Sequence, residues 1–482
     1  MQSLSYTGRD NEDIRQSLID LVPQLTDQWR DFNESDLGIT IIELIAGAQD
    51  MQNFYLDNQT FETYIDTAMQ DKNIRAILRA MNYRVPLMVS AIGMIRVEFM
   101  TPLEAGITFP LYTQFKCSEV RDVTYVSTKQ VSALVGSEYV DIPIMEGELK
   151  TIQVTKNELA KNITSTGKVS RRIYLNDNSV ADKSVKMVQN GIADGGTFWE
   201  EVDDALLKYW GGRYYSVHKD ATGNVYLLMS VNFMDLLPAD ADEPITITYI
   251  KTRGTKGLVN AYQIDTLLNL SEYNSLIYKV YNIEATSGAA DEPNLQYAKL
   301  LARAHAQTMG RYVTLEDYAN GIAINPTIMY SVVKDWKTTD LVNYPFTVFV
   351  WAVNLQGNNL SVLEQNNLIA PFRERGITAV GVEYQKTEFV YFDVSVVVYL
   401  KPVTEAERDR LLGAVEQYLV ETFSPENIDY GDRVSISILT SSIYTLSPYF
   451  KSVVIETPDK DVESTEIQLL RLRNVSVRAE ED

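Results

Sequence analysis

The chain has little of the chemistry that metal sites and many enzymes need. Its 482 residues include one cysteine, Cys117, and two histidines, His218 and His305. One cysteine excludes an intrachain disulfide, and these three residues are too few for a structural zinc site with four Cys or His ligands. His305 lies in a helix-like run, which favours a helix-surface position, and His218 lies in a strand-like run, which favours a solvated one. The sequence therefore predicts no metal, no cofactor and no catalytic residue, and we expect a protein that is not an enzyme.

Positive charge is also scarce. The chain has 43 Lys and Arg against 65 Asp and Glu, which gives a net charge of −22. Nucleic-acid binding needs clustered cations that displace counterions from phosphates, so this excess of acid argues against a nucleic-acid partner. A soluble surface that resists non-specific association accounts for the charge, and an acidic face that meets basic proteins is the alternative.

Long apolar runs are missing as well. The longest, from Phe389 to Leu400, is short and contains Asp393, so it is not expected to span a bilayer. Residues 1–10 lack the apolar core of a signal peptide. We therefore expect no membrane insertion, and folding in a cytoplasm.

Residues 1–86 predict a helical N-terminal segment. Apolar residues recur at helical spacing from Ile14 to Leu25 after a polar start at Asp10. Because proline removes a helical hydrogen bond, Pro23 predicts a break or kink near Val22.

The second helical pattern in this segment is apolar on more than one side. One stripe runs from Leu37 to Tyr55, and a second, offset stripe includes Ile42 and Ile45. A helix that is apolar on several sides must be buried on several sides, and the rest of residues 1–86 supplies too little cover. We therefore expect partner helices here, and the candidate partner-binding residues are Leu37, Ile41, Ile42, Leu44, Ile45, Met51 and Tyr55.

From residue 87 to residue 275 the apolar residues mostly alternate with polar ones. Segments such as 93–100 and 244–250 show the period of two that is typical of half-buried strands. Residues 155–196 are rich in polar residues and glycine, which predicts loops or an insertion. The pattern predicts one β-rich middle domain or two small ones.

The last third of the chain mixes helix and strand signals. Residues 276–330 predict a helical connector, 331–460 one or more α+β domains, and 461–482 a C-terminal tail. The order of elements after residue 330 suggests split βαβ character. The expected fold is thus multidomain α+β, with a helical N-terminal segment, β-rich middle domains and C-terminal α+β modules.

Helix starts in this part carry capping boxes, in which a hydroxyl and a carboxylate three residues later satisfy free amides. The three pairs are Thr314 with Asp317, Ser361 with Glu364, and Thr404 with Glu407. Gly376 is placed to end the second of these helices.

Three segments carry longer motifs. They are Tyr6-Thr-Gly-Arg-Asp with Asp31-Phe-Asn-Glu-Ser-Asp-Leu-Gly-Ile-Thr-Ile-Ile-Glu-Leu; Ile245-Thr-Ile-Thr-Tyr-Ile-Lys-Thr-Arg-Gly-Thr-Lys-Gly-Leu-Val-Asn; and Gly310-Arg-Tyr-Val-Thr-Leu-Glu-Asp-Tyr-Ala. Together they resemble the baseplate wedge and baseplate J-like family of contractile-tailed bacteriophages and related contractile injection systems. The third is similar to that family's Gly-Arg-x-Val-Thr-x-Glu-Asp-Tyr signature. A departure is Asn232-Phe-Met-Asp-Leu-Leu, where relatives often have a Phe-Gly-Asp-Gly turn.

This resemblance implies a structural role in a virion. It implies a wedge subunit of the tail baseplate, assembled in the host cytoplasm, that pairs with a second copy of itself. The N-terminal helices would join another wedge protein, and the C-terminal domains would contact neighbouring wedges in a ring around the hub. That ring would relay a conformational change to sheath-proximal proteins and so to sheath contraction.

Two other functions stay open on the residues alone. A baseplate-associated glycan hydrolase needs two carboxylates, and acidic residues are abundant. A carbohydrate-binding tail protein would use aromatic side chains, such as Arg213-Tyr-Tyr with Trp199 and Trp210. Aromatic residues at strand spacing are more often part of a core.

Overall fold

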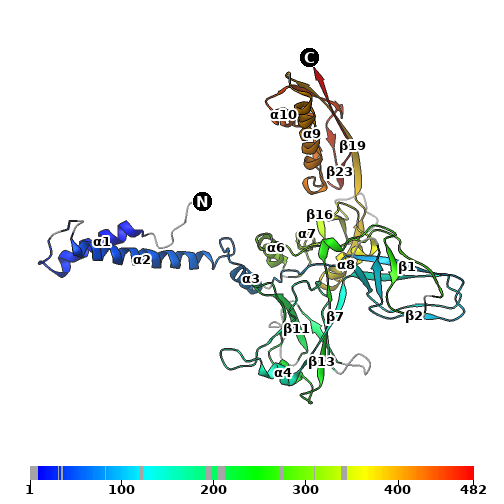
Figure 1. The fold of residues 1–482 in the computed structure, drawn as a ribbon, viewed down its shortest axis with the longest axis horizontal. Coiled ribbons are helices and arrows are strands. Elements are labelled where there is room, and N and C mark those ends of the chain that lie inside the picture. Colours follow the sequence, from blue (N-terminus) through cyan, green and yellow to red (C-terminus); the bar gives the residue numbers. More distant parts are fainter. Residues whose placement is uncertain are drawn as a thin grey trace.

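We analysed a computed structural model of the chain. It describes residues 9–30, 32–33, 36–81, 83–118, 123–189, 197–202, 212–270, 273, 275–308, 310–337 and 345–481. Figure 1 shows a central body from which two parts project, a helical arm near the N-terminus and the C-terminal sheet with its helices. The mixed α+β class expected from the sequence is confirmed. Residues named above that lie outside the described ranges are 6–8, 31, 34–35 and Trp210.

Helices α1 (Asn11–Leu25) and α2 (Leu37–Phe61) pack against each other and form the arm (Figure 1). Asp10 caps α1, because its side chain accepts a hydrogen bond from the amide of Asp13 at 3.0 Å. The break expected near Val22 is wrong, since α1 continues through Pro23 to Leu25. Pro23 lies in the last turn, where the loss of its N–H affects only the end of the helix.

The start of α2 depends on a glycine. Asp36 accepts a hydrogen bond from the amide of Gly38 at 2.6 Å, and the indole of Trp29 packs over the same residue. A Cβ atom at position 38 would lie 2.2 Å from the Trp29 ring. Any larger residue would therefore displace Trp29 from the loop that joins the two helices.

Helix α3 (Asp71–Ala80) connects the arm to the body by packing on α6 (Leu295–Thr308). Their contact is a small apolar core that includes Ile74 and Leu78 from α3 and Leu301 from α6. The base of the arm is thus built from two segments that lie far apart in the sequence.

The first β-rich unit is a six-stranded sheet in the order β14-β3-β4-β6-β1-β15, with a small sheet of β2 and β5. Its strands are β1 (Ile92–Phe99), β2 (Ile107–Phe109), β3 (Gln114–Cys117), β4 (Thr124–Ser127), β5 (Val131–Ala133), β6 (Tyr139–Glu146), β14 (Ile264–Leu267) and β15 (Ile277–Asn282). Because β15 pairs with β1, the segment expected as a helical connector begins with a strand, and its helices start only at Leu295.

The second β-rich unit is a seven-stranded sheet in the order β7-β13-β9-β10-β11-β12-β8. Its elements are β7 (Glu148–Thr155), α4 (Lys156–Lys161), β8 (Arg172–Tyr174), β9 (Lys186–Gln189), β10 (Thr197–Glu201), β11 (Tyr214–Lys219), β12 (Val225–Met229), α5 (Phe233–Leu236) and β13 (Pro244–Lys251). Residues 156–189, within the segment expected as loops or an insertion, supply α4, β8 and β9, and loops connect these elements. Strands β8 and β9 are too short to show an alternating pattern in the sequence. Both nevertheless belong to the sheet, and Met187 of β9 is fully buried.

Residues 328–385 form a three-stranded sheet covered by helices. It contains β16 (Ile328–Asp335), β17 (Thr347–Asn354) and β18 (Gly381–Gln385), with α7 (Leu315–Ala323) and α8 (Val362–Arg375). Strands β17 and β18 are parallel neighbours joined by α8. This is a βαβ unit, but the split form expected from the sequence is not formed, because no strand lies between the parallel pair.

The C-terminal unit is a sheet in the order β21-β19-β23 with two helices against it. Its elements are β19 (Glu388–Leu400), α9 (Glu405–Thr422), β20 (Arg433–Val434), α10 (Ile436–Thr445), β21 (Phe450–Thr457), β22 (Val462–Glu463) and β23 (Gln468–Glu481). Strand β23 runs parallel to β19 along its whole length, so the tail expected at 461–482 is wrong for residues 468–481. The alternation from Leu470 to Ala479, with arginines at polar positions, was the available strand signal in this segment.

The capping boxes predicted at α7 and α8 are confirmed, and at α9 only the Thr404 half is present. Gly376 does end α8, but with an extended backbone and not the left-handed one that favours glycine. A Cβ atom there would lie 2.4 Å from the carbonyl oxygen of Phe372, which explains the small residue.

We expect Thr314→Ala to lower the free energy of unfolding by about 1 kcal/mol, because α7 loses its cap. Thr314→Ser keeps the hydroxyl and should retain most of that stability.

Hydrogen bonds from the amides of Thr314 and Val313 lower the pKa of Asp317. Its contribution is therefore present at neutral pH and is lost as the pH falls below about 4. Urea unfolding midpoints of the unmodified chain and of Thr314→Ala, measured across pH, check both expectations. If Thr314→Ala keeps the midpoint of the unmodified chain but fails to assemble, Thr314 is a contact residue and not a cap.

Candidate assembly surfaces

The inner side of the arm is buried within the hairpin itself. Ile14 of α1 and Ile39 and Ala46 of α2 are almost completely buried, and Ile42 is 7% exposed. Arg15 on α1 lies 3.5 Å from a carboxylate of α2 and adds a polar contact at the edge. Ile42 is thus removed from the candidate partner-binding residues, because its side chain already belongs to the core of the arm.

The outer side of α2 is apolar and exposed. The other six candidates are between 49% and 75% exposed, and they are Leu37, Ile41, Leu44, Ile45, Met51 and Tyr55. Phe54 and Leu56, which were not among the candidates, are also more than half exposed. We call these eight residues the arm surface. The sequence feature that could have identified Phe54 and Leu56 is the apolar run Phe54-Tyr55-Leu56. Consecutive residues of a helix point in different directions, so one partner helix cannot cover all three side chains.

An exposed apolar surface of this kind has an energetic consequence. Burying a Leu or Ile side chain contributes roughly 1.5–3 kcal/mol, and soluble monomers rarely expose many such residues together. Figure 1 shows the arm extending away from the body, so the body does not cover its outer side. A partner can therefore gain substantial binding energy from the arm surface.

The arm is fixed to the body through a carboxylate. Glu62, at the end of α2, accepts hydrogen bonds from the amides of Met69 and Gln70 at 3.1 Å and from the Asn73 side chain at 2.9 Å. Lys299 of α6 donates to a carbonyl in the same loop at 2.5 Å. Burial raises the pKa of Glu62, but the hydrogen bonds outweigh it and the net pKa is lowered. The loop between α2 and α3 is thus held in one conformation.

The cysteine and the two histidines all pack against other residues of the fold. Cys117 is fully buried in the core of the six-stranded sheet. His305 packs on the ring of Tyr83, with 5.6 Å between ring centroids. His218 is not in a solvated position as expected: its Nε2 lies 2.8 Å from the hydroxyl of Ser216, and burial with nearby arginines lowers its pKa to about 3. Among the described residues, no group of three or more His, Cys, Asp and Glu side chains could hold a metal ion.

Two of the aromatic side chains considered for carbohydrate binding, Trp199 and Tyr215, do not form an open platform, and Trp210 lies outside the described residues. Trp199 is 4% exposed and Tyr215 is 2% exposed, and both belong to the core of the seven-stranded sheet. The hydroxyl of Tyr215 donates to the carbonyl of Val185 at 2.7 Å. These residues stabilise the sheet and leave no ring face for a sugar.

Three buried or half-buried carboxylates hold parts of the fold together. Glu146 accepts a hydrogen bond from the Thr252 hydroxyl at 2.6 Å, and burial raises its pKa. Asp182 and Glu201 both pair with Arg84, which joins the segment after α3 to the seven-stranded sheet. Each of these three acids has a partner within the fold.

Comparisons with known proteins add little to this geometry. No protein-family model matches the sequence, and no curated protein matches it. Among solved structures, a chain of the six-fold symmetrised cryo-EM structure of the anti-feeding prophage (AFP) baseplate is similar, with 12% sequence identity over 95% of this chain and 90% of that chain. The TM-score is 0.33, and a likeness at that level does not establish a common fold. Within the described ranges, no helix is both long and apolar enough to cross a membrane.

Proposed function

We propose that this chain is a structural wedge subunit of a contractile tail baseplate. In this role it pairs with a second copy, builds a ring around the hub and relays a conformational change toward the sheath. The observation that carries the proposal is the arm, a helical hairpin that extends from the body with the arm surface exposed. The three motifs that resemble the wedge and J-like family point the same way.

Each region has a task in this proposal. The arm surface binds helices of another wedge protein, because apolar side chains at helical spacing match a partner helix. The C-terminal projection extends from the body (Figure 1), and β21 and β23 form the edges of its sheet. In the proposed role, this projection contacts neighbouring copies. The body holds these two binding regions at a fixed separation, so that movement of one displaces the other.

The proposed location can be tested on isolated particles. Gold-labelled antibodies against this chain should bind at the baseplate end of purified contractile particles. Labelling along the sheath, at the opposite end, or nowhere on intact and disrupted particles would contradict the role.

The two alternatives have direct assays. A glycan hydrolase would clear peptidoglycan in a zymogram, and a carbohydrate-binding protein would bind a glycan array. The burial of Trp199 argues against carbohydrate binding through that side chain. We expect neither clearing nor binding from the full chain.

A further inference from the structure

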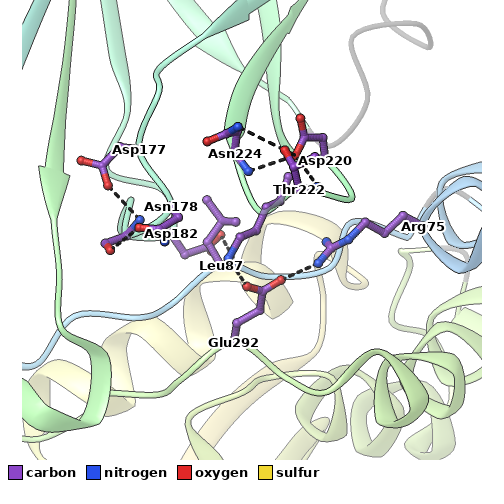
Figure 2. A network of polar contacts seen from close by, with 11 residues as sticks. Arg75, Leu87, Asp177, Asn178, Asp182, Asp220, Thr222, Asn224 and Glu292 are labelled. Carbon is purple, nitrogen blue, oxygen red and sulfur yellow. Dashed lines mark hydrogen bonds and ion pairs between the residues drawn. The ribbon is translucent and has the colours of Figure 1, made fainter. Parts of the chain in front are cut away.

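A cleft of about 380 Å³ lies where the base of the arm meets the seven-stranded sheet. One wall is α3 with the segment that follows it, and the other consists of β8, β11, β12 and the turn between β11 and β12. Figure 2 shows part of this region, with Arg75 reaching in from α3 and the turn of Asp220, Thr222 and Asn224 nearby. Its volume is within the range of small-ligand sites.

The cleft is strongly cationic in a chain whose net charge is −22. Six of the residues that line it carry a positive charge, and Asp220 is the one carboxylate among the described lining residues. The cations are Lys72, Arg75, Arg79, Arg84, Arg172 and Lys219. Cations from α3, from the following segment and from two strands therefore meet in one place.

Carboxylates behind the walls pair with three of these cations. Glu292 accepts hydrogen bonds from Arg75 at 2.9 Å and from Lys219 at 2.5 Å (Figure 2). Asp182 and Glu201 pair with Arg84. Arg75, Arg84 and Lys219 are thus held in place by acids behind the walls.

Each wall also carries an exposed cation. Lys72 on α3 and Arg172 on β8 are exposed and line the cleft. The guanidinium of Arg172 lies over the ring of Tyr226, with its carbon 5.0 Å from the centroid, which holds it against the sheet wall. His218 lies on the same wall, and because it is neutral at pH 7 it can donate or accept a hydrogen bond without adding charge.

We propose that this cleft is a binding site for a compact oxyanion with two or more negative charges, carried on phosphate or carboxylate groups. Guanidinium groups match the geometry of both groups and form charge-assisted hydrogen bonds that are about twice as strong as neutral ones. Lys72 and Arg172, exposed on opposite walls of the cleft, fit an anion of that charge. Its binding would join α3 to the sheet and so stiffen the base of the arm.

The test is calorimetric titration of the full chain at constant ionic strength, with pyrophosphate and with citrate as probes. We expect at least one probe to bind, and comparison of the two distinguishes phosphate from carboxylate chemistry. Lys72→Gln combined with Arg172→Gln should weaken binding by about tenfold or more, since each removes a charge-assisted contact. Both side chains are exposed, so the melting temperature should stay unchanged.

Arg410→Gln is the matched control, because it removes one charge from an exposed side chain on α9 whose contact is Glu407, one turn away. It should bind the probe as the unmodified chain does. The single variant Lys72→Gln separates lost binding from lost folding if the double variant melts early. Absence of binding for both probes, or equal weakening by Arg410→Gln, would overturn the proposal.

Discussion

Deletion of residues 1–61 should leave a folded body that no longer binds the wedge protein proposed as its partner. The cut follows α2 and removes the arm surface with the whole hairpin. It keeps Glu62, whose hydrogen bonds hold the loop before α3. We expect the melting temperature of the body to change little, because the sheet cores contain no residue from the arm.

The position of this cut matters for the interpretation. Deletion of residues 1–86 would also remove α3 and so expose the apolar side of α6, including Leu301. Loss of assembly could then result from a damaged body. If the chain without residues 1–61 still joins the partner in normal stoichiometry, binding resides outside the arm and our assignment is wrong.

The second large effect is expected from two neighbouring isoleucines of α2. Ile41 is 50% exposed and Ile42 is 7% exposed, so the same residue type has opposite surroundings. Ile41→Asp should leave the stability of the free chain within about 0.5 kcal/mol. It should weaken partner binding by more than about a hundredfold, because the complex would bury an unpaired charge.

Ile42→Ala is the matched variant for the inner side of the hairpin. Removal of a buried Ile side chain costs about 2–5 kcal/mol, so hydrogen exchange of the amides in α1 and α2 should accelerate in the free chain. Ile41→Ala should not accelerate it. Equal partner affinity for Ile41→Asp and the unmodified chain would show that the arm surface is not the binding face.

Local signals in the sequence predicted local structure well. The apolar spacing from Leu37 to Tyr55 predicted α2, and the hydroxyl–carboxylate pairs predicted the caps of α7 and α8. The same spacing predicted that α2 is apolar on several sides, but not which side the hairpin uses. That choice depends on the tertiary contact between α1 and α2, which buries Ile42 and leaves Ile41 exposed.

Long-range pairing explains what the sequence did not predict. Strand β23 contains Arg471, Arg473 and Arg478, and it becomes a strand because β19 offers a partner along its full length. Arg473 forms an ion pair with Asp393 of β19, a contact between residues far apart in the chain. The cationic cleft escaped prediction for the same reason, since Lys72, Arg172 and Lys219 come together only in the folded chain.

The most direct test of the wedge assignment is native mass spectrometry of the full chain mixed with candidate wedge proteins. The account predicts a complex that contains two copies of this chain and the partner, and its loss when residues 1–61 are deleted. A chain that stays monomeric with every wedge protein of the same particle, or a complex that forms equally well without the arm, would contradict it.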